Sequence, residues 1–250
     1  MANATITKPS AASAPPIVPE IDESPIPPLE NGDRLTRPEF ERRYDAMPGV
    51  KAELIEGVVY MASPVTHRKH GKPHHHANSW LGLYRYATPG VDAADNSSIR
   101  LDLDNMPQPD CFLNILPECG GQLRVSEDDY VETAPELIVE IASSSVSYDL
   151  NAKLRVYLRN GVLEYVVWRT RDRAVDWFLW VDGAYERQQL GADGLYRSVV
   201  FPGLWLDPKA LIADERPRMM EVNRLGTATP EHAAFVERLR LAAGPPPVGV

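Results

Sequence analysis

The spacing of hydrophobic residues in the first third of the chain predicts a hairpin followed by a helix. Two short apolar runs, 52–55 and 58–61, are separated by Glu56-Gly57, a pattern typical of a β-hairpin. In residues 73–87 the apolar positions recur with helical spacing, and Pro73 suits the first turn of a helix.

The middle of the chain is dominated by patterns typical of strands, which are predicted at 91–94, 98–103 and 111–115. The β-branched run 136–141 predicts a buried strand, and 162–168 predicts another. Between them, residues 147–159 have helical spacing and end at Asn160-Gly161. A strand–helix–strand unit normally gives two parallel strands joined by a right-handed crossover.

Antiparallel hairpins and closing helices are predicted in the last third. Residues 176–181 and 184–189 flank Asp182-Gly183, which indicates a hairpin, and short strands are predicted at 196–201 and 204–206. Helices are predicted at 208–212, 219–225 and 231–241. Together the patterns predict an α/β (α+β) fold with a mixed central sheet flanked by helices and extra antiparallel hairpins.

The composition divides the chain into three segments. Residues 1–34 are rich in Pro, Ala and Ser and are predicted to be a disordered tail. Residues 35–213 form the main domain, which begins with a short helix capped by Thr36 and ending at Asp45. Residues 214–250 form a helical extension with a loose, proline-rich end.

The charge and the cysteine content narrow the range of functions. The formal net charge is −9, and the pI is 5.2, which lowers the expectation of a basic surface that coats nucleic acid. Cys111 and Cys119 do not form a disulfide framework, so we expect two free thiols. No run of about 20 apolar residues and no secretory signal is present, which predicts a cytoplasmic protein without a membrane span.

Two carboxylates lie where burial is costly. Asp110 follows Pro109 at the mouth of the strand 111–115, and Glu140 lies inside the buried run 136–141. A carboxylate in such a place needs a cation, a metal or a raised pKa. The simpler alternatives are a turn residue for Asp110 and an internal salt bridge for Glu140.

Glu53 and Lys153 extend this pair into a constellation. Lys153 either forms an exposed pair with Asp149, four residues earlier, or reaches over the sheet end toward Glu140. Glu53 by itself is an ordinary surface residue. If the carboxylates converge, their hard oxygen ligands suit Mg²⁺, and the lysine would orient water or neutralise developing negative charge.

An ordered series of short motifs runs through about 160 residues of the chain. The motifs are Glu53-Leu54-Ile55-Glu56-Gly57, Ser63-Pro64, His70-Gly71, Gln108-Pro109-Asp110, Pro135-Glu136-Leu137-Ile138-Val139-Glu140-Ile141, Tyr148-Asp149-Leu150 with Lys153, and Asn160-Gly161-Val162 through Glu164-Tyr165. This series resembles the Uma-type restriction endonuclease family of the PD-(D/E)xK nuclease superfamily.

The resemblance implies a DNA endonuclease that depends on Mg²⁺ or Mn²⁺. It implies that Asp110 and Glu140 are metal ligands, with Glu53 as a third acidic member. Among the histidines, His70 alone is a further candidate for a ligand near this acidic site. Ala142 stands where the superfamily motif has its lysine, and the resemblance suggests that Lys153 replaces it. A symmetric homodimer would suit cutting of opposite strands.

Other features keep rival hypotheses open. The histidines between His67 and His76 would suit Zn²⁺ or Ni²⁺ in a histidine-zinc hydrolase, although Pro73 disfavours one regular helix through them. A further alternative is a catalytically inactive nuclease-fold binding protein. The aromatic residues between 168 and 180 fit core packing better than base stacking. Five arginines would form either a phosphate-binding rim or solvated faces: Arg155, Arg159, Arg169, Arg171 and Arg173.

Overall fold

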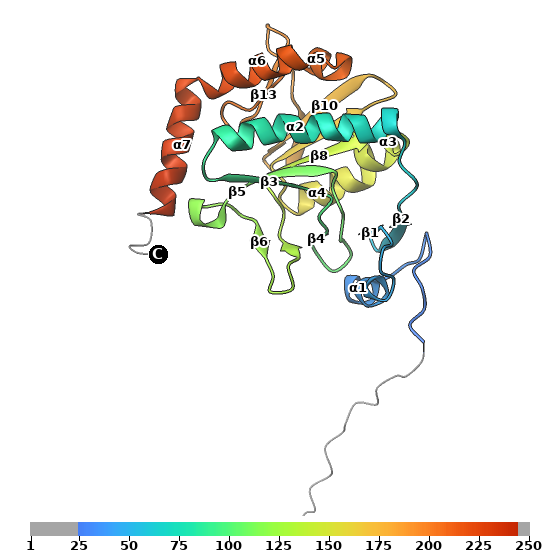
Figure 1. Ribbon diagram of the computed structural model, residues 1–250. Helices are drawn as coiled ribbons and strands as arrows, with labels where there is room; N and C mark the ends of the chain where they lie inside the picture. The colour runs from blue at the N-terminus through green and yellow to red at the C-terminus, as the bar shows by residue number, and fades with distance from the viewer. Residues whose placement is uncertain (1–24, 245–250) are drawn as a thin grey trace, which may run out of the picture.

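A six-stranded mixed sheet is the centre of the computed structural model, which describes residues 25–244 (Figure 1). Of its five strand pairings, β8–β9 is parallel and the other four are antiparallel, so the predicted mixed sheet is confirmed. In spatial order the strands are β11 (Ala184–Arg187), β10 (Ala174–Val181), β9 (Glu164–Arg169), β8 (Leu137–Ala142), β5 (Cys111–Ile115) and β3 (Val91–Asp95).

The crossover between the parallel strands is one helical segment with an irregular centre. It consists of α3 (Val146–Tyr148), a π-helical turn (Asp149–Lys153) and α4 (Leu154–Arg159). The predicted strand–helix–strand unit is therefore present, but the expected regular helix is wrong in its middle. A π-turn adds one residue to a helical turn and often occurs at functional sites.

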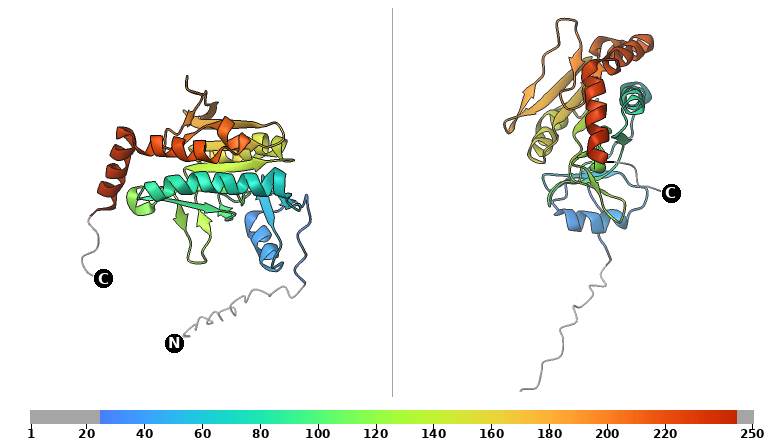
Figure 2. Two further views of the ribbon diagram at one scale, coloured as in Figure 1. Left: turned by 45° about the horizontal axis from the view of Figure 1, so that its top comes forward. Right: turned by 90° about the vertical axis from the view of Figure 1, so that its left-hand side faces the viewer.

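Alternate residues of β8 enter two different cores, one on each face of the sheet. Leu137, Val139 and Ile141 pack in the core that includes α2, whereas Ile138 and Ala142 pack in the core that includes α4. Successive side chains of a strand point to opposite faces, which explains this division. The α2 face is also covered by α6 and α7 (Figure 2). The bounds of these helices are Lys72–Ala87 for α2, Arg216–Thr227 for α6 and Pro230–Ala243 for α7, and the short helix α5 (Pro208–Ala213) precedes α6.

A hairpin and a short helix form a smaller unit beside the sheet. The predicted hairpin is confirmed as β1 (Ala52–Ile55) and β2 (Val58–Met61), and α1 (Arg37–Asp45) packs against it. Thr36 precedes α1 as predicted, but its side chain makes no capping hydrogen bond, so only the position of the cap is confirmed. The small core of this unit contains Phe40, Leu54, Val59 and Met106.

Residues 29–34 belong to the folded unit, so the predicted tail boundary at residue 34 is too late. Leu29 is 4% exposed, and the Gly32 N–H donates to the Val59 carbonyl at 2.8 Å. Arg34 forms an isolated β-bridge with Val58. The hairpin edge binds this segment through its backbone, which the composition did not indicate. Residues 1–24 and the predicted loose end from 245 lie outside the described residues.

The remaining elements are short. The predicted strand 98–103 is reduced to β4 (Ile99–Arg100), which pairs with β7 (Val131–Glu132), and β6 (Arg124–Val125) joins them. The strand predictions at 196–201 and 204–206 shrink to β12 (Tyr196–Arg197) and β13 (Trp205–Leu206). Both cysteines are free, as predicted. Between residues 25 and 244, no helix has the length and apolar character needed to cross a membrane.

Candidate active site

Asp110 and Glu140 are brought together by the register of β5 and β8. The antiparallel ladder pairs Cys111 with Val139 and Phe112 with Ile138, so its continuation places Asp110 opposite Glu140. The Ile141 N–H donates to Asp110 Oδ2 at 2.7 Å. Ile138 faces α4, and the period of two places Glu140 on that face as well.

Lys153 reaches Glu140 from the π-turn, as in the second of the two predicted alternatives. Its Nζ lies 2.8 Å from Glu140 Oε1 and 2.8 Å from Glu53 Oε1, and the side chain is 5% exposed. Tyr157, one turn along the helix, donates its hydroxyl to the same Glu140 oxygen at 2.8 Å. Glu140 Oε2 makes no hydrogen bond within the described residues.

Glu53 enters the site because the hairpin joins the segment that leads to Asp110. Leu54 forms a β-bridge with Met106, and Glu53 Oε1 accepts a hydrogen bond from the Gln108 N–H at 2.7 Å. The structure therefore places all four predicted residues in one site: Glu53, Asp110, Glu140 and Lys153. Their catalytic and metal-binding roles stay predictions.

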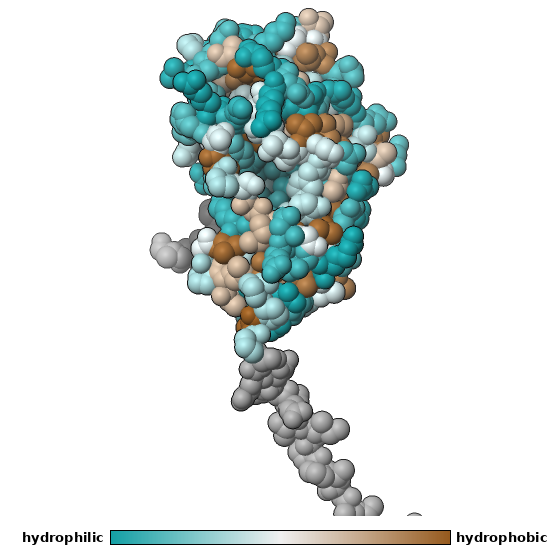
Figure 3. All heavy atoms as spheres, turned by 90° about the vertical axis from the view of Figure 1, so that its right-hand side faces the viewer, coloured by the Kyte–Doolittle hydropathy of each residue, from teal (hydrophilic) through white to brown (hydrophobic). Residues whose placement is uncertain are grey.

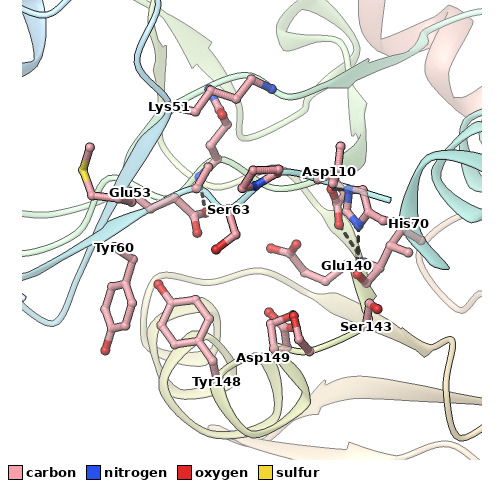
Figure 4. Close-up of a pocket in the computed structure, with 18 of the residues that line it drawn as sticks. Lys51, Glu53, Tyr60, Ser63, His70, Asp110, Glu140, Ser143, Tyr148 and Asp149 are labelled. Atoms are coloured by element: carbon pink, nitrogen blue, oxygen red, sulfur yellow. Dashed lines mark hydrogen bonds and ion pairs between the residues drawn. The ribbon is translucent and has the colours of Figure 1, made fainter. Parts of the chain in front are cut away.

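Asp149 is a fourth carboxylate, which the sequence suggested only as an exposed partner of Lys153 and as part of a family motif, not as a site residue. It is 3% exposed, lines the same cavity and accepts a hydrogen bond from the Ser145 hydroxyl at 2.6 Å. Its neighbour Tyr148 points its hydroxyl into the cavity, and this buried hydroxyl has no hydrogen-bond partner among the described residues (Figure 4). The signal was present in the sequence, because Asp149 precedes Lys153 by one helical turn.

His70 is held between an acidic and a carbonyl oxygen. Its Nε2 lies 3.2 Å from Asp110 Oδ1, and its Nδ1 lies 3.3 Å from the Ile141 carbonyl oxygen. The hydrogen bond with Asp110 raises the pKa of His70 despite the opposing effect of burial. Burial would raise the pKa of Asp110, but the hydrogen bond and the charge of His70 hold it below its usual value. We conclude that this pair favours imidazolium and carboxylate.

The four carboxylates outnumber the two cations that pair with them. Burial raises the pKa of Asp149 to about 6, and it raises that of Glu140 against the charge of Lys153. Burial would lower the pKa of Lys153, but Glu140, Glu53 and Asp149 raise it well above its usual value. Lys153 and His70 are the two cations against these four acids, so the fully ionised centre has an excess of two negative charges.

These side chains line a cavity of about 560 Å³ (Figure 4). Glu53 comes from the hairpin, Asp110 and Glu140 from the sheet, and Asp149 from the crossover helix. In the view of the right-hand side of Figure 1, the hollowed region is mainly hydrophilic (Figure 3). The volume lies within the range of small-ligand sites, and the open side admits a larger substrate.

The oxygen atoms of this centre are of the kind that divalent cations bind, although within the described residues they are not preassembled around one metal position. Mg²⁺ prefers carboxylate oxygens and balances an excess of two negative charges. Asp110, Glu140 and Glu53 supply such oxygens, and Glu140 Oε2 is not committed to another group. Lys153 now lies between Glu53 and Glu140, so a metal would bind on the side of Glu140 that faces away from this ammonium.

The histidines do not converge as the zinc hypothesis required. His74 Nε2 lies 2.8 Å from the Asp110 carbonyl oxygen, His76 pairs with Asp214, and His75 is exposed. A second π-turn, His67–Gly71, precedes α2 and turns His70 toward Asp110. Across residues 25–244, no three His, Cys, Asp or Glu side chains form a preassembled metal-binding group.

Burial and pairing decide between the alternatives for the tryptophans and for two of the arginines. Trp177 is fully buried and Trp168 is 5% exposed, so they belong to the core as expected, whereas Trp180 is 42% exposed. Arg155 and Arg159 pair with Glu56 and do not line the cavity.

The mixed sheet flanked by helices matches a nuclease fold. A solved structure from Anabaena variabilis is described as a "putative nuclease belonging to DUF820". The match covers 69% of this chain and 96% of the chain of that structure, with a TM-score of 0.53 and 16% sequence identity. The model of the Uma2 family, described as "Putative restriction endonuclease", matches residues 37–209. The chain therefore belongs to the Uma2 family. The comparison with curated proteins gave no match.

Proposed function

We propose that this protein is a Mg²⁺- or Mn²⁺-dependent endonuclease that hydrolyses DNA phosphodiester bonds. The observation that carries the proposal is the convergence of four carboxylates and one buried lysine on a single open cavity. Glu140 and Asp149 are buried, and Glu53 and Asp110 are half-buried. A purely structural ion pair needs neither the cavity nor the excess of acids. Membership in the Uma2 family supports the nuclease class.

Each residue has a distinct task in the proposed reaction. Asp110 and Glu140 would hold the metal with help from Glu53. The bound metal would lower the pKa of a water molecule and stabilise negative charge in the transition state. Lys153 stays protonated, so its ammonium neutralises charge that develops on the phosphate and orients the attacking water. His70 orients Asp110 by holding one of its oxygens.

Cleavage of supercoiled plasmid DNA tests the proposal. Wild-type protein should nick or linearise the plasmid in Mg²⁺ or Mn²⁺ and not in EDTA. Asp110→Asn and Glu140→Gln should each reduce the rate at least about 100-fold, the scale on which loss of one transition-state contact acts. Glu186→Gln, an exposed carboxylate on β11 outside the cavity, is the matched control and should leave the rate unchanged.

The result also separates cleavage from binding. Unchanged cleavage in both Asp110→Asn and Glu140→Gln would overturn the assignment of the site. Wild-type protein that binds DNA but does not cleave it with either metal would support the binding-protein alternative. In that case the buried ion pair of Lys153 with Glu140 and Glu53 would act only as a structural centre.

A further inference from the structure

Three exposed cationic side chains on the rim of the cavity pair with no carboxylate of the described residues. They are Lys51, Lys69 and Arg171. Lys51 donates one hydrogen bond, to Asn96 Oδ1 at 3.1 Å. Arg68 and Arg173, which flank two of these residues in the sequence, are also exposed and make no ion pair with a described carboxylate.

The absence of carboxylate partners at this rim contrasts with two other arginines of the predicted phosphate-binding set. Arg169 pairs with Asp172 and Asp176, and Arg155 pairs with Glu56. These internal partners satisfy the cations. Of the five arginines proposed from the sequence as a phosphate-binding rim, only Arg171 both lines the cavity and lacks a carboxylate partner among residues 25–244.

Hydrogen bonds fix the two segments that carry Lys69 and Arg171 beside each other. The Thr170 hydroxyl donates to the Lys69 carbonyl oxygen at 2.9 Å, and the Thr170 N–H donates to the Ala142 carbonyl at 3.0 Å. The turn after β9 is therefore held against the π-turn that carries His70. Lys51 comes from a different wall, because it directly precedes β1 and Glu53.

These positions meet an electrostatic requirement of the proposed function. The centre has an excess of negative charge and the whole protein has a net charge of −9, so a polyanionic strand would be repelled without local cations. Cations without an internal partner bind phosphates at no cost in broken ion pairs. They also release the counterions of the nucleic acid, which makes binding depend on salt.

We propose that Lys51, Lys69 and Arg171 form a phosphate rim that holds a DNA strand on two sides of the phosphate at the acidic centre. This inference rests on the proposed function, because it assumes that the strand lies across the cavity. Lys69 and Arg171 bind phosphates on the His70 side, and Lys51 binds one on the hairpin side. The rim contacts the backbone and therefore binds different sequences about equally.

The salt dependence of binding tests the phosphate rim. Fluorescence anisotropy with a labelled DNA duplex would be recorded over a series of KCl concentrations, for wild-type protein in EDTA and for Glu140→Gln in Mg²⁺. In both backgrounds, Lys69→Gln with Arg171→Gln should make the slope of log K against log salt shallower by about 2, and Lys51→Gln by about 1. Lys209→Gln with Arg224→Gln is the matched control, since both are exposed, unpaired within the described chain and outside the cavity. The control should keep the wild-type slope.

Two outcomes would overturn the rim. In the first, the duplex binds neither wild-type protein in EDTA nor Glu140→Gln in Mg²⁺. In the second, the Lys69→Gln, Arg171→Gln variant keeps the wild-type slope of log K against log salt. Failure of the nuclease proposal looks different, because the rim variants would still change the slope while wild-type protein fails to cleave in Mg²⁺ or Mn²⁺. Conversely, cleavage that depends on Glu140 would leave the nuclease proposal standing even where the rim variants keep the wild-type slope.

Discussion

Two buried glutamates on neighbouring strands, Glu140 on β8 and Glu164 on β9, have opposite surroundings. Both interrupt apolar runs, and they are 4% and 0% exposed. Glu164 accepts hydrogen bonds from the Val199 N–H at 2.7 Å, the Val200 N–H at 2.9 Å and the Trp177 indole at 3.1 Å. It thus joins the loop after β12 to the sheet, and neutral donors surround it.

Glu140 instead faces charged groups and an open cavity. Lys153 and Tyr157 share one of its oxygens, and three other carboxylates line the same cavity. The comparison shows that burial of a carboxylate in a strand does not by itself indicate function. Glu136, whose oxygens accept the Ile115 and Gln122 N–H groups, is a second structural case. The distinguishing property is whether neutral donors or further acids surround the carboxylate.

The largest expected difference is in stability. Glu164→Ala leaves two backbone N–H groups and the Trp177 indole without partners, so it should lower the free energy of unfolding by about 3–5 kcal/mol. Glu140→Gln should change it by less than about 1.5 kcal/mol, because the amide oxygen still accepts from Lys153 and Tyr157 and the buried Lys153 keeps its ion pair with Glu53. Urea unfolding followed by circular dichroism measures both.

Glu186→Ala controls for loss of a glutamate side chain, since Glu186 is exposed on β11. It should leave the urea midpoint unchanged. An equal loss of stability in Glu140→Gln and Glu164→Ala would show that both carboxylates are structural, and the contrast between them would fail.

The second largest expected effect is the dependence of the free energy of unfolding on pH through Asp149. Burial raises the pKa of Asp149 to about 6 in the folded protein, whereas an unfolded aspartate has a pKa of about 3.9. The folded state therefore holds this proton more tightly, and stability falls as the pH rises from about 4 to about 6. Asp149→Asn should remove this slope and raise the free energy of unfolding at pH 7 by about 2–3 kcal/mol.

Urea unfolding at several pH values between 4 and 8 measures the Asp149 effect. Asp172→Asn, an exposed aspartate in the turn after β9, is the control and should keep the wild-type slope over this range. Parallel pH profiles for wild type and Asp149→Asn would contradict the raised pKa.

The smallest expected effect is the stabilisation of the folded protein by Mg²⁺, which should depend on Glu140 in the acidic centre. At a Mg²⁺ concentration of about ten times Kd, binding to the folded state alone adds about 1.4 kcal/mol, which raises the melting temperature by about 3–5 °C. Glu140→Gln should abolish this rise, whereas Glu186→Gln should retain it. Differential scanning calorimetry in Mg²⁺ and in EDTA gives the comparison, and an equal rise in Glu140→Gln would exclude Glu140 as a ligand.

The sequence by itself determined most of the elements, because their signals are local. Hydrophobic periodicity placed the hairpin, α2 and the parallel β8–β9 unit, and the turn Asp182-Gly183 placed the last hairpin. The family motifs named Glu53, Asp110, Glu140 and Lys153 as one group. The predicted lengths of the short strands were too great. The length of a strand such as β4 depends on how many residues of its partner β7 pair with it, and the sequence of β4 does not show this.

Only the tertiary structure decided which acids meet and which are structural. Asp110 lies opposite Glu140 because of a register set between strands that are distant in the sequence. Asp149 and Lys153 reach the cavity from a π-turn, which periodicity does not predict. Two of the donors that satisfy Glu164 are the N–H groups of Val199 and Val200, more than thirty positions away. Hydrophobic patterns record which face of an element is buried, whereas the neighbours of a buried charge depend on long-range packing.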